Sequence, residues 1–155
     1  LPLTVIADEA EKLGISVSLE TILTGSELLN LLEIINHNNI KVVYDTGNRI
    51  AFGHDLPKDI ELLSGNINHI HIKDKNIRND NVILGTGLVN FHDVFQSLKN
   101  INYNGSYVFE TTRGKYPMKT AAYNMQLVNF FIENLTWKIL IEYCSLGSEE
   151  QGKDT

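Results

Sequence analysis

The chain has 155 residues, of which 43% are apolar and 21% charged, a composition typical of one soluble globular domain with a sizeable core. Its formal net charge of −6 argues against nucleic acid as the main partner, because affinity for a phosphate backbone depends on clustered lysine and arginine. We find neither an apolar run of about 18 residues or more nor a signal-peptide pattern, so we expect a cytoplasmic protein with no membrane partner.

Apolar periodicity and capping residues divide the sequence into alternating helices and strands. In chain order, the predicted elements are a helix over 3–13, a strand over 15–19, a helix over 28–35, a strand over 40–44, a helix over 55–64, a strand over 67–72, a helix over 91–99, a strand over 105–109 and a helix over 118–132. We expect residues 46–49 to form a tight turn rather than the start of a helix. Residues 73–90, rich in asparagine and glycine, are predicted to form a long loop at a ligand-binding rim.

The predicted strand over 67–72 alternates histidine with isoleucine. Because successive side chains on a strand point to opposite faces, His69 and His71 share one face, and Ile70 and Ile72 share the other. Two imidazoles on one face need hydrogen-bond partners or a ligand. We therefore do not expect the histidine face to be ordinary apolar core.

Each of the four predicted strands delivers one ionisable side chain at or near its C-terminal end: Glu20, Asp45, His71 and Glu110. The separations of 25 residues from Glu20 to Asp45 and 26 residues from Asp45 to His71 match one strand–loop–helix–loop unit. Parallel strands bring their C-terminal ends to one rim, where ligands and catalytic groups collect. Singly, each residue could be a helix cap or a solvated side chain, but the four together favour a shared metal site. Their oxygen and imidazole donors suit Mn²⁺, Mg²⁺, Co²⁺ or Zn²⁺.

Four further polar residues near the same rim are candidates for substrate contacts: His69, Asn48, Lys73 and Arg113. His69 could equally support His71 from the same strand face. His54 is interpreted as a histidine in a surface setting without a functional role. The single cysteine, Cys144, excludes an internal disulfide and is interpreted as an incidental thiol rather than a nucleophile.

Five short segments, in this order and spacing, resemble the motifs of the sugar-phosphate isomerase and epimerase superfamily, whose members have a xylose isomerase-like TIM barrel. They are Ser18-Leu19-Glu20, Tyr44-Asp45-Thr46-Gly47-Asn48, His69-Ile70-His71-Ile72-Lys73-Asp74, Gly85-Thr86-Gly87 followed by Phe91, and Phe109-Glu110. Hexulose-phosphate isomerases and ribulose-phosphate 3-epimerases look most similar, with hydroxypyruvate isomerase and inosose dehydratase as relatives. The resemblance covers about residues 5–133 and implies an α/β fold, with parallel (β/α) repeats forming the C-terminal half of a (β/α)8 TIM barrel.

The resemblance divides the chain at residue 134. Residues 1–134 are predicted to form the C-terminal half of a xylose isomerase-like TIM barrel, and residues 135–155 an apolar helix extension with a disordered tail. Because the chain starts at Leu1 rather than methionine, we expect a fragment whose N-terminal barrel half is missing. A half barrel leaves strand edges unpaired, so we expect it to form a homo-oligomer or to need that missing half.

The resemblance also implies an enzyme that acts on a small-molecule ketose or ketose phosphate. Glu20, Asp45, His71 and Glu110 would bind one divalent metal ion, and Glu20 and Glu110 would move the proton beside the carbonyl through a metal-stabilised enediolate. Two alternatives stay open: a lyase similar to inosose dehydratase, and a truncated remnant of the family without catalysis. A three-metal nuclease site like that of endonuclease IV would lack ligands, because Asn48 and residues 79–81 stand in their places.

Overall fold

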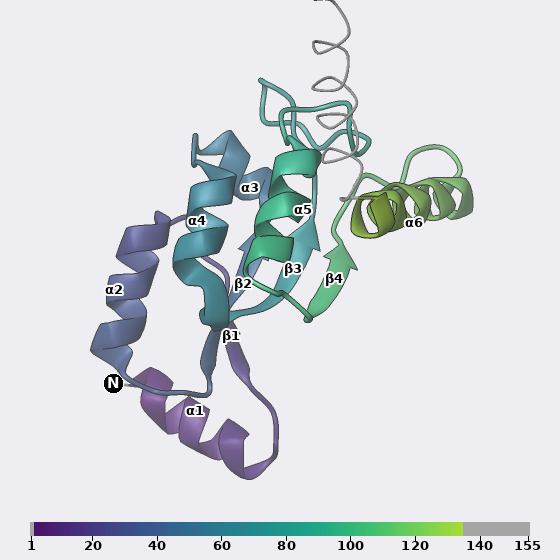
Figure 1. Ribbon diagram of the computed structural model, residues 1–155. Coiled ribbons are helices and arrows are strands. Elements are labelled where there is room, and N and C mark those ends of the chain that lie inside the picture. The colour runs from purple at the N-terminus through teal and green to yellow at the C-terminus, as the bar shows by residue number, and fades with distance from the viewer. Residues whose placement is uncertain (1, 135–155) are drawn as a thin grey trace, which may run out of the picture.

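The computed structural model describes residues 2–134, so the predicted extension over 135–155, including Cys144, lies outside the described residues. The described part of the chain alternates helices with strands, as Figure 1 shows. The elements are α1 (Pro2–Lys12), β1 (Val17–Leu19), α2 (Gly25–Ile35), β2 (Ile40–Asp45), α3 (Thr46–Ala51), α4 (Leu56–Leu63), the 3-10 turn η1 (Ser64–Asn66), β3 (Ile67–Ile72), α5 (Phe91–Asn100), β4 (Ser106–Phe109) and α6 (Pro117–Asn134).

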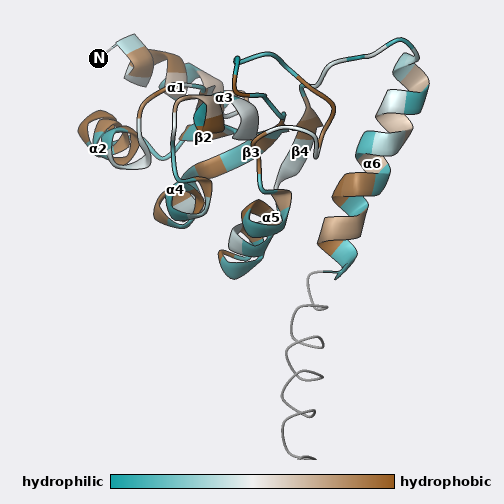
Figure 2. Ribbon diagram, turned by 90° about the horizontal axis from the view of Figure 1, so that it is seen from above, coloured by the Kyte–Doolittle hydropathy of each residue, from teal (hydrophilic) through white to brown (hydrophobic). Residues whose placement is uncertain are grey.

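The strands form one four-stranded sheet in the order β1-β2-β3-β4, and every neighbouring pair is parallel. Helices α2, α4 and α5 cover one face of this sheet (Figure 2). Their apolar sides bury the core against the strands, and α6 adds Val128 and Phe131, whose ring stacks on Phe95 of α5. This arrangement confirms the predicted succession of strand–helix units. None of the helices in residues 2–134 combines the length and apolar character needed to cross a membrane.

The segment after β2 differs from its prediction as a tight turn. Residues Thr46–Ala51 form the short helix α3, which starts at Asp45 because the Asp45 carboxylate accepts a hydrogen bond from the Asn48 N–H at 2.6 Å. Gly47, which suggested a turn, has a packing role instead. A Cβ at this position would lie 2.5 Å from Cγ of the buried Lys73 side chain.

A bulge in β3 sets which residues face which side of the sheet. The pairing of β2 with β3 shifts between Val42 and Val43, so that Ile67 pairs with Val42 while His69 pairs with Val43. Ile70 and Ile72 are fully buried on the helix-covered face, whereas His69 and His71 are partly exposed on the other face. The polar face expected from the His–Ile alternation is therefore confirmed.

The long loop over 73–90 is organised around one buried carboxylate. Asp74 is fully buried and accepts four backbone N–H hydrogen bonds, two on each oxygen. The donors are Lys75 (2.9 Å) and Val89 (3.1 Å) on Oδ1, and Gly85 (3.0 Å) and Gly87 (2.8 Å) on Oδ2. A loop without regular secondary structure is thereby fixed at the C-terminal rim of the sheet.

Candidate metal centre

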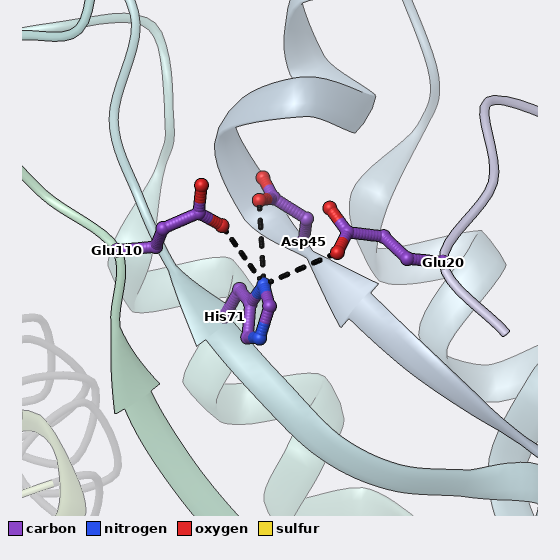
Figure 3. Close-up of side chains that lie close together, drawn as sticks. All are labelled: Glu20, Asp45, His71 and Glu110. Atoms are coloured by element: carbon purple, nitrogen blue, oxygen red, sulfur yellow. Dashed lines mark ion pairs between the residues drawn. The ribbon is translucent and has the colours of Figure 1, made fainter. Parts of the chain in front are cut away.

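Four side chains meet at the C-terminal ends of the four strands, as predicted from their positions at the strand ends (Figure 3). Glu20, Asp45, His71 and Glu110 each offer one ligand atom, and these atoms lie within 4.8 Å of one another. Nδ1 of His71 lies at the centre, 2.9 Å from Glu110 Oε2, 3.6 Å from Glu20 Oε2 and 3.8 Å from Asp45 Oδ2. The sheet brings together residues that are 90 positions apart in the sequence.

Asp45 and Glu20 are held in place by Asn48. Asp45 is buried, and its Oδ1 caps α3 by accepting the Asn48 N–H, which leaves Oδ2 directed toward His71. The Asn48 side-chain amide donates to Glu20 Oε1 at 3.3 Å. Asn48, predicted as a substrate contact, therefore lies against two of the four clustered residues.

Two buried atoms of the cluster, Asp45 Oδ2 and His71 Nδ1, each have a charged neighbour at 2.9 Å but make no well-aligned hydrogen bond within the described residues. A buried oxygen and a buried imidazole nitrogen are stabilised further when a partner takes up their lone pairs. A divalent cation would accept lone pairs from both atoms, and from the two glutamates. The donor set of three carboxylates and one imidazole therefore fits an ion such as Mn²⁺, Mg²⁺, Co²⁺ or Zn²⁺.

Lys73 supplies a buried positive charge beside this cluster. Its Nζ lies 2.9 Å from Asp45 Oδ2 and 2.8 Å from Glu110 Oε1. Burial alone would disfavour the ammonium, but its close contacts with the Glu110 and Asp45 carboxylates outweigh burial and raise the pKa of Lys73. In the same contact, the hydrogen bond from Lys73 lowers the pKa of Glu110. Three carboxylates and one ammonium leave two negative charges, which suits a divalent ion.

The remaining predicted contacts lie at different places on the rim. The His69 ring is on the same face as His71, with ring centroids 5.2 Å apart. Arg113 is exposed on the loop between β4 and α6, three residues beyond Glu110.

The prediction that His54 lies in a surface setting is wrong, because its side chain is only 7% exposed and its Nδ1 lies 3.2 Å from Asp59 Oδ2.

The sequence did not indicate that two charged residues near the cluster are buried. Asp74 was identified only as the last residue of a motif segment at the end of a strand, and its partners lie up to 15 residues further along the chain. Arg49 was placed in the expected turn, although it is 2% exposed and pairs with Asp59. A charged residue whose partners are distant backbone groups leaves no local pattern.

Comparison with known proteins identifies relatives of the whole described region. The family described as xylose isomerase-like TIM barrel matches residues 3–134. A ketose 3-epimerase from Arthrobacter globiformis is 32% identical over 114 residues, which are 68% of this chain and 38% of the relative. The L-ribulose-5-phosphate 3-epimerase UlaE from Salmonella paratyphi A is 33% identical over 86 residues, which are 55% of this chain and 30% of the relative.

Solved structures show the same architecture. An L-ribulose 3-epimerase matches with a TM-score of 0.78 at 21% identity, covering 90% of this chain and 54% of that one. A D-allulose 3-epimerase from Methylomonas sp., in complex with D-allulose, matches with a TM-score of 0.60 at 29% identity, covering 68% of this chain and 38% of that one. The chain thus spans about half or less of the length of these relatives. The likeness confirms the predicted fold class, parallel (β/α) repeats that form part of a TIM barrel.

Proposed function

This chain belongs to the xylose isomerase-like TIM barrel family, and on that premise we propose that it forms the metal-binding half of a sugar epimerase or isomerase. Its substrate would be a small ketose or ketose phosphate, the class named for the similar epimerases. The observation that carries the proposal is the cluster of Glu20, Asp45, His71 and Glu110 at the ends of four consecutive parallel strands. The same cluster supports the assignment of these four residues as ligands of one divalent ion.

The two glutamates are proposed to move the carbon-bound proton. Figure 3 shows Glu20 and Glu110 reaching toward His71 from opposite sides. Two carboxylates on opposite sides of a substrate allow one to remove a proton beside the carbonyl and the other to return a proton to the opposite face of the enediolate. A bound divalent ion would polarise the substrate carbonyl and make that proton more acidic. Epimerisation needs both carboxylates, whereas aldose–ketose isomerisation can proceed with one.

Lys73 and Asn48 are proposed to position the two glutamates for proton transfer. Lys73 lies 2.8 Å from Glu110 and favours its ionised form, which is the form that accepts a proton. The Asn48 amide fixes one oxygen of Glu20 and leaves the other directed at His71. His69 and Arg113 remain candidates for substrate hydroxyl or phosphate contacts at the same rim.

Hydrogen exchange from solvent tests the proposal. This chain, and the full-length product of its gene, would be loaded with Mn²⁺ and incubated in D₂O with free and phosphorylated ketoses. We expect deuterium at the carbon beside the carbonyl, detected by mass spectrometry, and a decrease of about 10²-fold or more in Glu20→Gln and Glu110→Gln. The exposed Glu9→Gln serves as the matched control.

Three results would contradict the proposal. Exchange at the unaltered rate in both glutamate variants would exclude these carboxylates as the proton carriers. A product 18 mass units lighter than its substrate, which indicates loss of water, would identify a lyase similar to inosose dehydratase instead. Absence of exchange in the metal-loaded full-length protein, for every ketose, would indicate a remnant without catalysis.

A further inference from the structure

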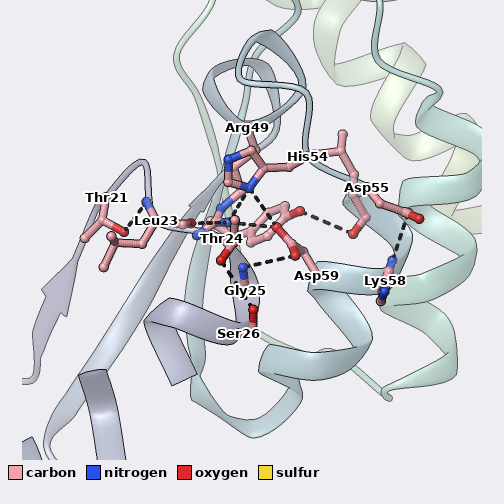
Figure 4. A network of polar contacts seen from close by, with 12 residues as sticks. Thr21, Leu23, Thr24, Gly25, Ser26, Arg49, His54, Asp55, Lys58 and Asp59 are labelled. Atoms are coloured by element: carbon pink, nitrogen blue, oxygen red, sulfur yellow. Dashed lines mark hydrogen bonds and ion pairs between the residues drawn. The ribbon is translucent and has the colours of Figure 1, made fainter. Parts of the chain in front are cut away.

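A buried ion pair joins α3, the helix that Asp45 caps, to α4 (Figure 4). Arg49 of α3 is 2% exposed, and its Nη1 donates to Asp59 Oδ2 of α4 at 2.8 Å. The same nitrogen donates to the Leu23 carbonyl at 3.1 Å, and the guanidinium lies over the Tyr44 ring, 4.7 Å from its centroid. Arg49 therefore joins α3 to the loop that follows β1.

Asp59 extends this connection to a third helix. Its Oδ1 accepts the backbone N–H of Gly25, the first residue of α2, at 3.1 Å. The approach is so close that a Cβ on Gly25 would lie 2.5 Å from Oδ1. The Arg49–Asp59 pair thus fixes α3, α4, the start of α2 and the loop after β1 relative to one another.

Arg49 is linked to two residues of the metal centre, Asp45 through α3 and Glu20 through the segment that ends at Leu23. Asp45 caps α3, the helix that carries Arg49. Glu20 begins the short segment that ends at Leu23, which Arg49 holds. Glu20 follows a strand of only three residues, and its side chain is 41% exposed. Besides the Asn48 amide, which contacts the Glu20 carboxylate, the Arg49 contact with the Leu23 carbonyl restrains the segment that carries Glu20. The Arg49 contact therefore helps to set the position of Glu20 relative to Asp45.

We propose that Arg49 and Asp59 are positioning residues of the metal centre, which act by setting Glu20 against Asp45. This role rests on the proposed function. Burying an ion pair costs desolvation that its attraction seldom exceeds, so apolar side chains of similar volume would stabilise the fold as well. The positioning of Glu20 against Asp45 explains why a charged pair stands here, whereas a contribution to the stability of the fold does not.

The test uses this chain, with Mn²⁺ affinity measured by calorimetry and ligand geometry reported by the visible absorption of bound Co²⁺. The double variant Arg49→Met/Asp59→Asn removes both charges together and keeps an oxygen that can accept the Gly25 N–H. We expect its Kd for Mn²⁺ to rise about tenfold or more and its Co²⁺ spectrum to change, with a urea midpoint near that of the unaltered chain. Arg78→Met, on an exposed loop, is the matched control and should leave both signals unchanged.

A second variant disturbs the pair without removing a charge, in case the double variant does not fold. In Gly25→Ala the new Cβ pushes against Asp59 Oδ1, and we expect weaker Mn²⁺ binding. Gly65→Ala is its matched control, because a Cβ at Gly65 meets nothing within 4 Å. Unchanged Mn²⁺ affinity and Co²⁺ spectrum in Gly25→Ala, or in a folded double variant, would overturn the positioning role alone. Failure of the unaltered chain to bind Mn²⁺ would overturn the metal centre, and the positioning role with it.

Discussion

Replacing Asp74 with asparagine should destabilise the chain strongly, because the loop over 73–90 depends on both carboxylate oxygens. Oδ1 accepts two N–H groups and Oδ2 accepts the other two. An asparagine offers one oxygen and one NH₂ group, so two N–H donors face another donor whichever way the amide is turned. Each lost hydrogen bond to a charged group costs about 1.5–3 kcal/mol, which gives about 3–6 kcal/mol for the two.

A loss of this size is comparable to the whole stability of many domains, about 5–15 kcal/mol. Urea unfolding followed by circular dichroism measures it, and limited proteolysis reports whether the loop over 73–90 opens. Asp80→Asn is the matched control, because Asp80 is exposed on the same loop, and its substitution should change stability by no more than about 0.5 kcal/mol. If Asp74→Asn lost no more stability than Asp80→Asn, the buried carboxylate would not be what holds the loop.

Three further predictions concern Gly87, the ionisation of Glu110 and the edge strands of the sheet. Gly87→Ala should destabilise the loop, since its Cβ would collide with the Asp74 carboxylate, and faster proteolysis than in Gly65→Ala measures this. With a chelator present, the stability advantage of the unaltered chain over Glu110→Gln should exist above about pH 4.5 and disappear as the pH falls through the lowered pKa of Glu110; urea midpoints at several pH values check this. In light scattering the isolated chain should self-associate, because β1 and β4 are edge strands; a stable monomer would contradict this.

The parts of this fold that are local or periodic could be predicted from the sequence. The His–Ile alternation indicated that His69 and His71 share a face, and the spacing of Glu20, Asp45 and His71 indicated one rim. Both patterns follow from geometry that every parallel strand–helix unit repeats. The structure brings Glu110 into the same cluster, although a long loop interrupts the spacing before it.

The parts that depend on distant partners could not be predicted in the same way. The segment after Asp45 contains a glycine and was expected to turn, but capping by Asp45 starts a helix there and the Lys73 side chain requires the small residue. The partners of Arg49 are a carbonyl 26 residues earlier and a carboxylate 10 residues later. Nothing in the residues adjacent to Arg49 indicates either contact, so its buried position becomes visible only in three dimensions.

The most direct test of the central claim is a calorimetric titration of this chain with Mn²⁺, alongside His71→Ala. His71 Nδ1 lies at the centre of the cluster and its side chain belongs to the polar face, so its removal should spare the fold. We expect the unaltered chain and the control His92→Ala to bind one equivalent of Mn²⁺, and His71→Ala to bind it at least about tenfold more weakly. No saturable binding to the unaltered chain, or equal affinity in His71→Ala, would contradict a metal centre formed by these four residues.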